Sequence, residues 1–427
     1  MRESNQYRIP LAFQHEGSLP RMSDAAALAT ARTEFDPRTV RTWRNAIIAA
    51  FALGGITVAS WGPRLPAVLQ ALHTDTDTLG LILGSVTIGS IAGLLTATPV
   101  LHALRSRGAI RASLVVAALA LAVMGIGIGS GSVGVTTVAF ILVGYGVGTL
   151  DVLINVEGAA VEKAAGRTLM PLMHGGWSVG AAAGAGFGTL CAALGISPSV
   201  QFLAEAALVV AAGIVLTAFI APGSRHEDAA RSQTRRQKIA AWAGGWVDWR
   251  LLLIGVVMLG VELAEGSANS WMTLSVHEDH GRTAAVSALF FTAFAVTEAL
   301  TRIFGGPVVD RLGRVRTTRL TTGLGVVGVI LFILGGSPWV VLAGVLLWAI
   351  GVSMGFPLGM SAAAESGPNP VARLSVVATI AYLANLAGPP AVGLLAERFG
   401  LLNTLWLIVA LMVAACACAG ALRRPRP

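Results

Sequence analysis

Three polar side chains recur at helical spacing inside the long apolar run at residues 250–275. Glu262, Glu265 and Asn269 are three and four residues apart, so one face of a helix carries all three. Two neighbouring carboxylates repel each other where the dielectric is low, and we expect one of them to keep its proton near neutral pH. That property suits a proton-coupling site. The alternative is a pair of acids that water and backbone groups satisfy.

A further acid lies in the apolar run at 135–160, where Asp151 precedes Asn155 by about one helical turn. We expect Asp151 to take part in proton coupling and Asn155 to line a solute cavity. His174 lies near the start of the run at 169–194, at a depth that would reach this pair. Its imidazole titrates near neutral pH. A buried histidine that only makes hydrogen bonds is the competing interpretation.

The run at 284–309 contains Glu298 and Arg302 four residues apart, an arrangement that predicts an internal ion pair. Arg302 would bind a carboxylate-bearing solute if Glu298 moved away. Near the outer end of the first apolar run, Arg64 either attracts anionic solutes and closes a gate or extends to the membrane interface. The other predicted cavity residues are Trp177, Asn269, Trp271, Tyr382 and Asn385.

These side chains lie in a chain with the composition of a membrane protein. Of its 427 residues, 55% are hydrophobic and 12% are charged, whereas soluble domains carry about 25% charged residues. A bilayer core of about 30 Å needs roughly 20 apolar residues per helix. The sequence therefore predicts an all-α integral membrane protein of twelve transmembrane helices, at residues 44–70, 78–104, 109–130, 135–160, 169–194, 199–221, 250–275, 284–309, 316–335, 338–362, 372–396 and 400–422.

Positive charge is distributed unevenly between the segments that join these runs. With the N-terminus inside the cell, the cytoplasmic segments carry 26 of the 30 Lys and Arg, as is typical of membrane proteins. We therefore expect both termini in the cytoplasm and no nucleic-acid partner, despite a net charge of +8. The predicted organisation is a disordered tail at 1–43, six-helix bundles at 44–222 and 250–422, a linker at 223–249 and a basic tail at 423–427.

The two predicted bundles share short sequence matches. Ser60-Trp61 matches Ser270-Trp271 at an offset of 210, and residues 99–104 match residues 307–312 at an offset of 208. Two matches at nearly equal offsets indicate two pseudo-symmetric halves. Repeats of this kind place a solute site at their interface, near the middle of the membrane.

The second of these matches continues into a family motif. Residues 306–316 read G-P-V-V-D-R-L-G-R-V-R and resemble the loop signature of the major facilitator superfamily, G-x-x-x-D-R-x-G-R-x-R. The first-half counterpart departs from it, because His102 stands where the acid is expected and about three inserted residues precede Gly108. The resemblance implies two bundles that rock around a central site. It also implies a gating role for Gly306, Asp310, Arg311, Gly313 and Arg314.

Within that superfamily, residues 151–158 (D-V-L-I-N-V-E-G), followed by Glu162, Gly166 and His174, resemble a bacterial subgroup. This MosC-like/YbjJ-like subgroup is distantly similar to fucose permeases. The resemblance implies a multi-pass protein of the bacterial cytoplasmic (inner) membrane. Glu157 and Glu162 lie nearer the interface than Asp151, and we expect water to solvate them.

Helix-breaking and small residues mark two further segments. Gly388-Pro389-Pro390 predicts a bend, a break or an unwound segment in the run at 372–396. The glycines at 180–188 predict close packing between helices. They also superficially resemble a motif of drug/proton antiporters, although Ala185 replaces the expected proline. They therefore favour export only slightly.

Together these features predict a monomeric secondary transporter that moves a small solute by alternating access, with protons and the lipid bilayer as its other partners. The solute is a sugar-like, polyol-like or other small organic metabolite, or an exported drug-like compound. A proton-independent facilitator and a non-transporting sensor or scaffold are the alternatives. The sequence contains no phosphate loop or nucleophile motif, and Cys191, Cys416 and Cys418 lack partners at ligand spacing, so we expect no enzyme, cofactor or metal.

Overall fold

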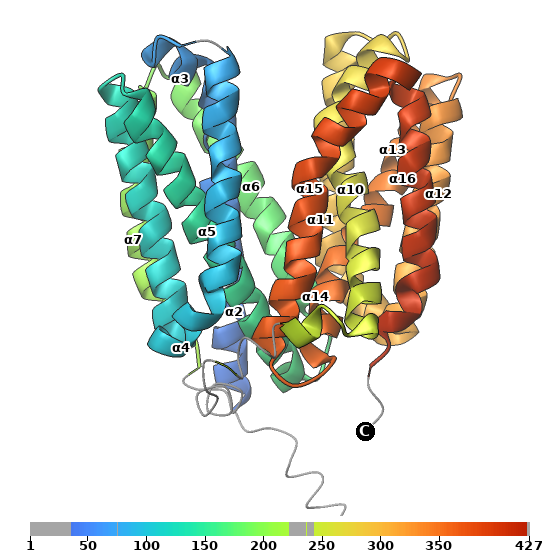
Figure 1. The fold of residues 1–427 in the computed structure, drawn as a ribbon, viewed down its shortest axis with the longest axis horizontal. Helices are drawn as coiled ribbons and strands as arrows, with labels where there is room; N and C mark the ends of the chain where they lie inside the picture. The colour runs from blue at the N-terminus through green and yellow to red at the C-terminus, as the bar shows by residue number, and fades with distance from the viewer. Residues whose placement is uncertain (1–35, 75, 222–235, 237–242, 425–427) are drawn as a thin grey trace, which may run out of the picture.

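The computed structural model describes residues 36–74, 76–221, 236 and 243–424. The regular structure within these residues is helical, without strands. Figure 1 shows the helices gathered into two groups, an N-terminal half from α2 to α7 and a C-terminal half from α10 to α16. Both described ends of the chain lie at the same end of the molecule, which we name the termini end. Most of the predicted tail at 1–43 and of the predicted linker at 223–249, and the end of the basic tail, lie outside the described residues.

The helices of the N-terminal half begin at recognisable caps. Asp36 accepts a hydrogen bond from the backbone amide of Arg38, and Ser132 and Ser197 each accept one from the amide three residues on. The first helix thus starts before residue 44, and the predicted disordered tail is wrong for residues 37–43. The elements are α2 (Pro37–Ala59), η1 (Gly62–Arg64), α3 (Leu65–Ala71), α4 (Thr76–Gly129), α5 (Val133–Ala165), α6 (Met170–Ala193) and α7 (Pro198–Thr217).

The C-terminal half differs from the prediction at two places. The predicted run at 338–362 is divided at Met354 into two helices. The predicted break at Gly388-Pro389-Pro390 is wrong, because one helix continues through it, and a Cβ on Gly388 would lie 2.3 Å from Leu263, so a neighbouring helix packs closely there. The elements are α10 (Trp249–Glu278), α11 (Ala284–Leu312), α12 (Arg314–Leu334), α13 (Pro338–Ser353), α14 (Gly355–Glu365), α15 (Pro370–Phe399), α16 (Leu401–Cys418) and η2 (Ala419–Leu422).

The length and composition of these helices are those of a multi-pass membrane protein. Among the described residues, nine helices are long and apolar enough to cross a membrane. One of them, Leu81–Gly129, covers two of the predicted runs. The runs at 169–194 and 372–396 form α6 and α15, which are not among the nine. The count of twelve spans therefore stays a prediction.

Glycines bring α2 and α6 into backbone contact. A Cβ added at Gly180 would lie 2.0 Å from the carbonyl oxygen of Ala52, and one at Gly184 would lie 2.6 Å from that of Ile56. Both distances are shorter than the contacts that Cβ atoms make in proteins, so a residue with a side chain would not fit at either position. A Cβ at Gly186 would meet nothing within 4 Å. Most of the glycine series at 180–188 is thus explained by close packing between two helices, as its spacing predicts.

The backbone turns sharply at corresponding points of the two halves. Arg105 has φ 58° and ψ 168° within α4, and Gly313 has φ 81° and ψ 154° between α11 and α12. The two residues are 208 positions apart, which is the offset found between residues 99–104 and 307–312. The insertion predicted before Gly108 is therefore wrong, because Arg105 occupies the place of the motif glycine and Gly108 continues the helix.

Replacing Arg105 with glycine is expected to stabilise the protein. A residue with a Cβ costs about 1–3 kcal/mol in this region of φ and ψ, whereas glycine's extra freedom in the unfolded chain costs roughly 0.5–1 kcal/mol. The Arg105 side chain is exposed, so little packing is lost. Thermal unfolding in detergent should show a midpoint about 1–3 °C higher. The matched change Gly313→Ala should lower it, and a lower midpoint for Arg105→Gly would contradict the assignment of strain.

Candidate functional site

Arg302 on α11 lies at the centre of a buried group of charges. The residue is 7% exposed, and its guanidinium contacts two carboxylates. Glu298, one turn earlier on α11, contacts Nη1, and Glu265 on α10 lies 2.7 Å from Nη2. Glu262, one turn earlier on α10, is buried and lies close enough to act on the charge of Arg302. One fixed positive charge thus faces three acids.

The same guanidinium joins the two halves of the molecule. Its Nη1 donates to Ser178 Oγ on α6 at 3.3 Å, and its Nε donates to the carbonyl oxygen of Ser353 at 3.3 Å. Ser353 is the last residue of α13, where carbonyl groups lose their helical partners. The division of the predicted run at Met354 therefore supplies an acceptor for Arg302.

The N-terminal half contributes a hydrogen-bonded series of three side chains. Nε2 of His174 lies 3.1 Å from Oδ1 of Asn155, and the Asn155 amide group donates to Oδ1 of Asp151 at 3.2 Å. Because this amide group points to Asp151, Nε2 of His174 carries the proton and donates. All three side chains are buried. Tyr382 on α15 interacts with the Asp151 carboxyl group from the other half.

Two aromatic rings from different halves enclose the imidazole of His174. Phe51 on α2 meets it edge-on with ring centroids 4.8 Å apart, and Phe356 on α14 does so at 5.1 Å. His174 also lies one turn before Ser178 on α6, so both polar groups meet on one helix. We name the whole set the central cluster. It comprises Asp151, Asn155, His174, Ser178, Glu262, Glu265, Glu298, Arg302 and Tyr382.

Other predicted site residues lie apart from this cluster. Arg64 is 3% exposed and donates to the carbonyl oxygens of Gly188 and Ile196, both in its own half. Its side chain therefore does not extend to the membrane interface. Asn269 is exposed, farther along α10 from the termini end. The ring of Trp177 covers Gly54, and that of Trp271 lies against Gly393. The side chain of Asn385 is outside the described part of the chain.

A second set of charges connects the halves nearer the termini end. Arg314 donates to Glu365 at 2.7 and 2.9 Å, to Glu162 at 3.0 Å and to Ser361 at 2.5 Å. Glu162, at the end of α5, is 3% exposed and also accepts from the backbone amides of Leu169 and Met170. The expectation that water solvates Glu162 is therefore wrong, because the other half covers it. It is also wrong for Glu157, which is 2% exposed and accepts from Nε1 of Trp43 at 2.9 Å.

The aspartate of the loop motif binds the opposite half through the backbone. Oδ1 of Asp310 accepts from the amide of Thr168 at 2.8 Å. A Cβ on Gly306 would lie 2.9 Å from the carbonyl oxygen of Thr168, so this glycine permits the approach. Arg311 and Gly313 are exposed. We name this set, comprising Glu162, Thr168, Asp310, Arg314, Ser361 and Glu365, the end cluster.

Asp248 fixes the start of α10 at the same end. Its carboxylate accepts from the amides of Arg250 and Leu251, and Arg373 on α15 donates to it at 2.6 Å. Burial opposes ionisation, but the guanidinium of Arg373 and the two amides outweigh it and lower the pKa of Asp248 below its ordinary value. The pair therefore stays ionised at neutral pH and connects α10 to α15.

The arrangement of helices matches solved transporters. The crystal structure of the Escherichia coli fucose:proton symporter FucP aligns with a TM-score of 0.77, at 15% identity, over 90% of this chain and 98% of that chain. Similarity at this level of identity shows the fold.

Sequence comparison shows the family. An uncharacterised transporter of Sinorhizobium fredii is 29% identical over 362 residues, which are 84% of this chain and 92% of the relative. The membrane protein MosC of Rhizobium meliloti is 25% identical over 377 residues, or 87% of this chain and 88% of its own. A family model matches residues 46–369 and 254–427. The predicted resemblance is thus confirmed, and the chain belongs to the Major Facilitator Superfamily of membrane transporters.

Proposed function

We propose that this chain is a proton-coupled secondary transporter of the bacterial inner membrane, with twelve spans and both termini in the cytoplasm. It moves a small solute by alternating access between its two halves. The observation that carries the proposal is the position of Arg302. This guanidinium contacts Glu265 and Glu298 in its own half and Ser178 in the other. A proton on either carboxylate therefore alters a contact between the halves.

The coupling follows from competition for one guanidinium. While Glu265 and Glu298 are both ionised, they hold Arg302 between α10 and α11. When Glu265 takes up a proton, Arg302 loses one charge partner and is free to shift relative to Ser178. Asp151 is the second proton-accepting group that we propose, because it faces Tyr382 across the interface. Movement of the halves would change the surroundings of both acids.

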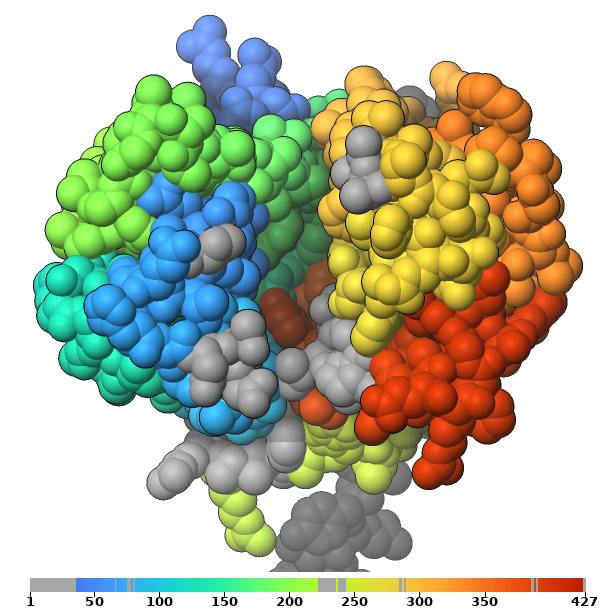
Figure 2. Space-filling model, turned by 90° about the horizontal axis from the view of Figure 1, so that it is seen from above, coloured from blue at the N-terminus to red at the C-terminus, as the bar shows by residue number. Residues whose placement is uncertain are grey.

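The described conformation is open to the outside if the termini end faces the cytoplasm. The end cluster joins the halves at that end. Figure 2, viewed from the opposite end, shows a hollow between the halves. Alternating access then requires that Arg314 and Glu162 separate while the hollow closes. Asn269, which is exposed on α10, would face solute in that hollow.

The charges of the central cluster favour a neutral polar solute. Four acids, Asp151, Glu262, Glu265 and Glu298, stand against the single guanidinium of Arg302. An anionic solute would have to displace Arg302 from its carboxylates. A sugar- or polyol-like metabolite only needs hydrogen-bonding groups, and the similarity to a fucose:proton symporter supports that class. An exported drug-like compound is the other candidate.

Uptake into proteoliposomes tests the coupling. Solutes would first be selected by the shift that they cause in thermal unfolding of the purified protein, across sugars, organic acids, amino acids and antibiotics. One proton moving down 100 mV releases about 2.3 kcal/mol, enough for a roughly fiftyfold solute gradient. We expect the wild type to accumulate the selected solute when a proton gradient is imposed. Glu265→Gln should move it only down its gradient.

The acids are distinguished from one another by matched changes. Glu262→Gln and Asp151→Asn test the two other predicted proton-coupling groups, and Glu397→Gln, at an exposed site on α15, is the control. Accumulation that persists in all three site variants would remove the coupling assignment. Solute flux that ignores the gradient in the wild type would identify a facilitator. The absence of flux for every solute that binds would favour a sensor.

A further inference from the structure

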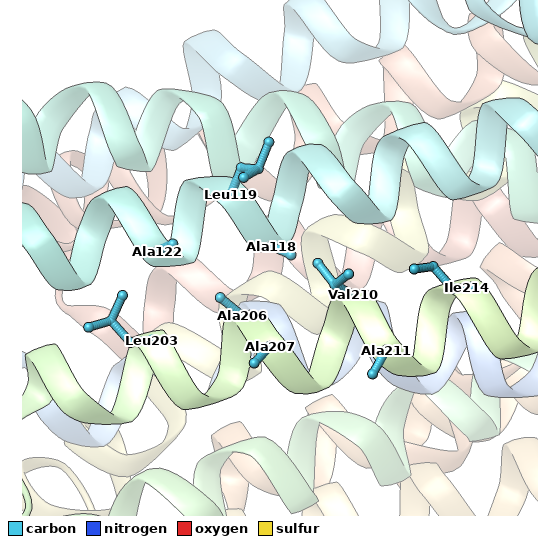
Figure 3. A pocket seen from close by; sticks show the side chains of 9 residues that line it. All are labelled: Ala118, Leu119, Ala122, Leu203, Ala206, Ala207, Val210, Ala211 and Ile214. Atoms are coloured by element: carbon cyan, nitrogen blue, oxygen red, sulfur yellow. The ribbon is translucent and has the colours of Figure 1, made fainter.

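An apolar groove follows the N-terminal half between α7 and the part of α4 that comes after Arg105 (Figure 3). Its volume is about 530 Å³, within the range of small-molecule sites. Five alanines and four larger aliphatic residues line it, so every lining side chain is a hydrocarbon. Figure 1 places α7 and the part of α4 that follows Arg105 on the side of this half that faces away from the C-terminal half. In a membrane protein that side meets lipid.

On the α4 side, the groove ends at a basic side chain, that of Arg111. Arg111 precedes Ala118 by seven residues and Ala122 by eleven, so these three positions share one face of α4. Nε of Arg111 donates to Oγ1 of Thr217 at 3.0 Å. Thr217 follows the lining residue Ile214 by three positions on α7. The guanidinium of Arg111 therefore stands at the termini end of the groove.

A second guanidinium lies one turn farther toward the termini end. Nε of Arg107 donates to the backbone carbonyl oxygen of Ile220. Arg111 is thus fixed to the last residue of α7 and Arg107 to the turn that follows it, both through Nε. Their Nη groups carry further N–H donors. Arg111 is exposed, and Arg107 is half-buried. A hydrocarbon groove that ends at two fixed cations has the chemistry of one ligand class, an acyl chain attached to an anionic headgroup.

We propose that this groove binds one acyl chain of an anionic phospholipid, with the lipid phosphate on Arg107 and Arg111. Ala122 lies eleven positions after Arg111, which is a distance of about 16 Å along the helix. Half of a hydrocarbon core of about 30 Å is of the same length, so the groove matches one leaflet. The phosphate then lies at the membrane surface of the termini end. Guanidinium groups bind phosphate oxygens through paired, charge-assisted hydrogen bonds.

The lining favours lipid over a second protein chain. Protein interfaces depend on aromatic or arginine anchors that fill pockets, and this groove offers only methyl and methylene groups to a partner. An acyl chain fills such a surface without polar groups that would need partners. The positive charge is also confined to one end of the groove, which matches a lipid with a single charged headgroup. A groove that binds a protein would be expected to carry charged residues along its length.

Lipid titration of the full-length protein tests the proposal. The protein in neutral detergent would be titrated with dioleoylphosphatidylglycerol or dioleoylphosphatidylcholine, with binding followed by native mass spectrometry and thermal unfolding. We expect phosphatidylglycerol to bind more tightly than phosphatidylcholine. The double change Arg107→Gln and Arg111→Gln should weaken phosphatidylglycerol binding by about tenfold or more. It should weaken phosphatidylcholine binding less, because the choline cation of that lipid already offsets its phosphate. Arg316→Gln, an exposed arginine at the same end, is the single-charge control.

A second pair of variants tests the groove itself. Ala207→Phe adds bulk inside the groove, and Ala204→Phe adds the same bulk on an exposed site of α7 outside it. Only the first should reduce phosphatidylglycerol binding. Equal binding of the two lipids by the wild type, or equal effects of the two phenylalanines, would overturn the proposal. So would a dimer that Ala207→Phe abolishes, because the groove would then belong to a second copy of the chain.

Discussion

Transport by an Arg302→Gln variant is expected to fall by about a hundredfold or more. Removing one partner of a buried ion pair costs roughly 3–5 kcal/mol, because the other charge stays buried without compensation. Here both Glu265 and Glu298 would lose their common cation, and the contact to Ser178 would be lost as well. The initial rate of solute flux in proteoliposomes, normalised to the amount of reconstituted protein, measures the effect.

Two further variants separate charge from geometry. Arg302→Lys keeps the charge, but a single ammonium group cannot reproduce a planar fork that reaches two carboxylates and a hydroxyl, so its rate should be intermediate. The double variant with Glu298→Gln removes one of the uncompensated acids and should regain thermal stability without regaining transport. Arg398→Gln, at an exposed site, is the control. An Arg302→Gln rate equal to that of this control would show that the guanidinium is dispensable.

Opening of the termini end is the second large effect that we expect, and Arg314→Gln should produce it. Arg314 is 5% exposed and is the cation that Glu162 and Glu365 share. Loss of that cation leaves Glu162 buried without compensation while the halves stay together, at a cost of about 3–5 kcal/mol. Separation of the halves would let water reach the carboxylate. The equilibrium should therefore move toward conformations in which this end is open.

Thiol labelling reports this change. Thr168 is 5% exposed at the contact between the halves, and only its backbone takes part in the bond to Asp310. A Thr168→Cys change, in a chain whose three native cysteines are replaced by serine, should react at least about tenfold faster when Arg314→Gln is present. The neighbouring exposed Arg316→Gln should leave the rate unchanged. Equal labelling rates in the two backgrounds would exclude a role for Arg314 in holding this end closed.

The difference between these two clusters shows what the sequence could reveal. The pair formed by Glu298 and Arg302 follows from spacing within one helix, and the structure contains it. The approach of Glu265 to the same arginine depends on how α10 and α11 pack, which spacing within one helix does not contain. The hydrogen bond between His174 and Asn155 matches the depth that the apolar runs predict for both residues.

Contacts between the halves were the least predictable feature. Glu162 follows a run that ends at 160, so its position alone predicts solvation, and only the covering C-terminal half reverses this. The sequence did not identify Ser361 and Glu365 as partners of Arg314, because no helical spacing links them to that residue. The break at Met354 likewise lies within an unbroken apolar run. Apolar runs thus predict helices, whereas their divisions and their contacts across an interface depend on tertiary structure.

The enclosure of His174 by two phenylalanines gives the protein a built-in chemical reporter. Phe51 and Phe356 belong to different halves, so parting of the halves on that side withdraws one ring and admits solvent to the imidazole. Acylation of His174 by diethyl pyrocarbonate, or its nitrogen chemical shifts in an isotope-labelled sample, would then follow the conformational cycle without an attached probe. Both measurements can be made on the unmodified sequence while the protein is reconstituted in lipid vesicles.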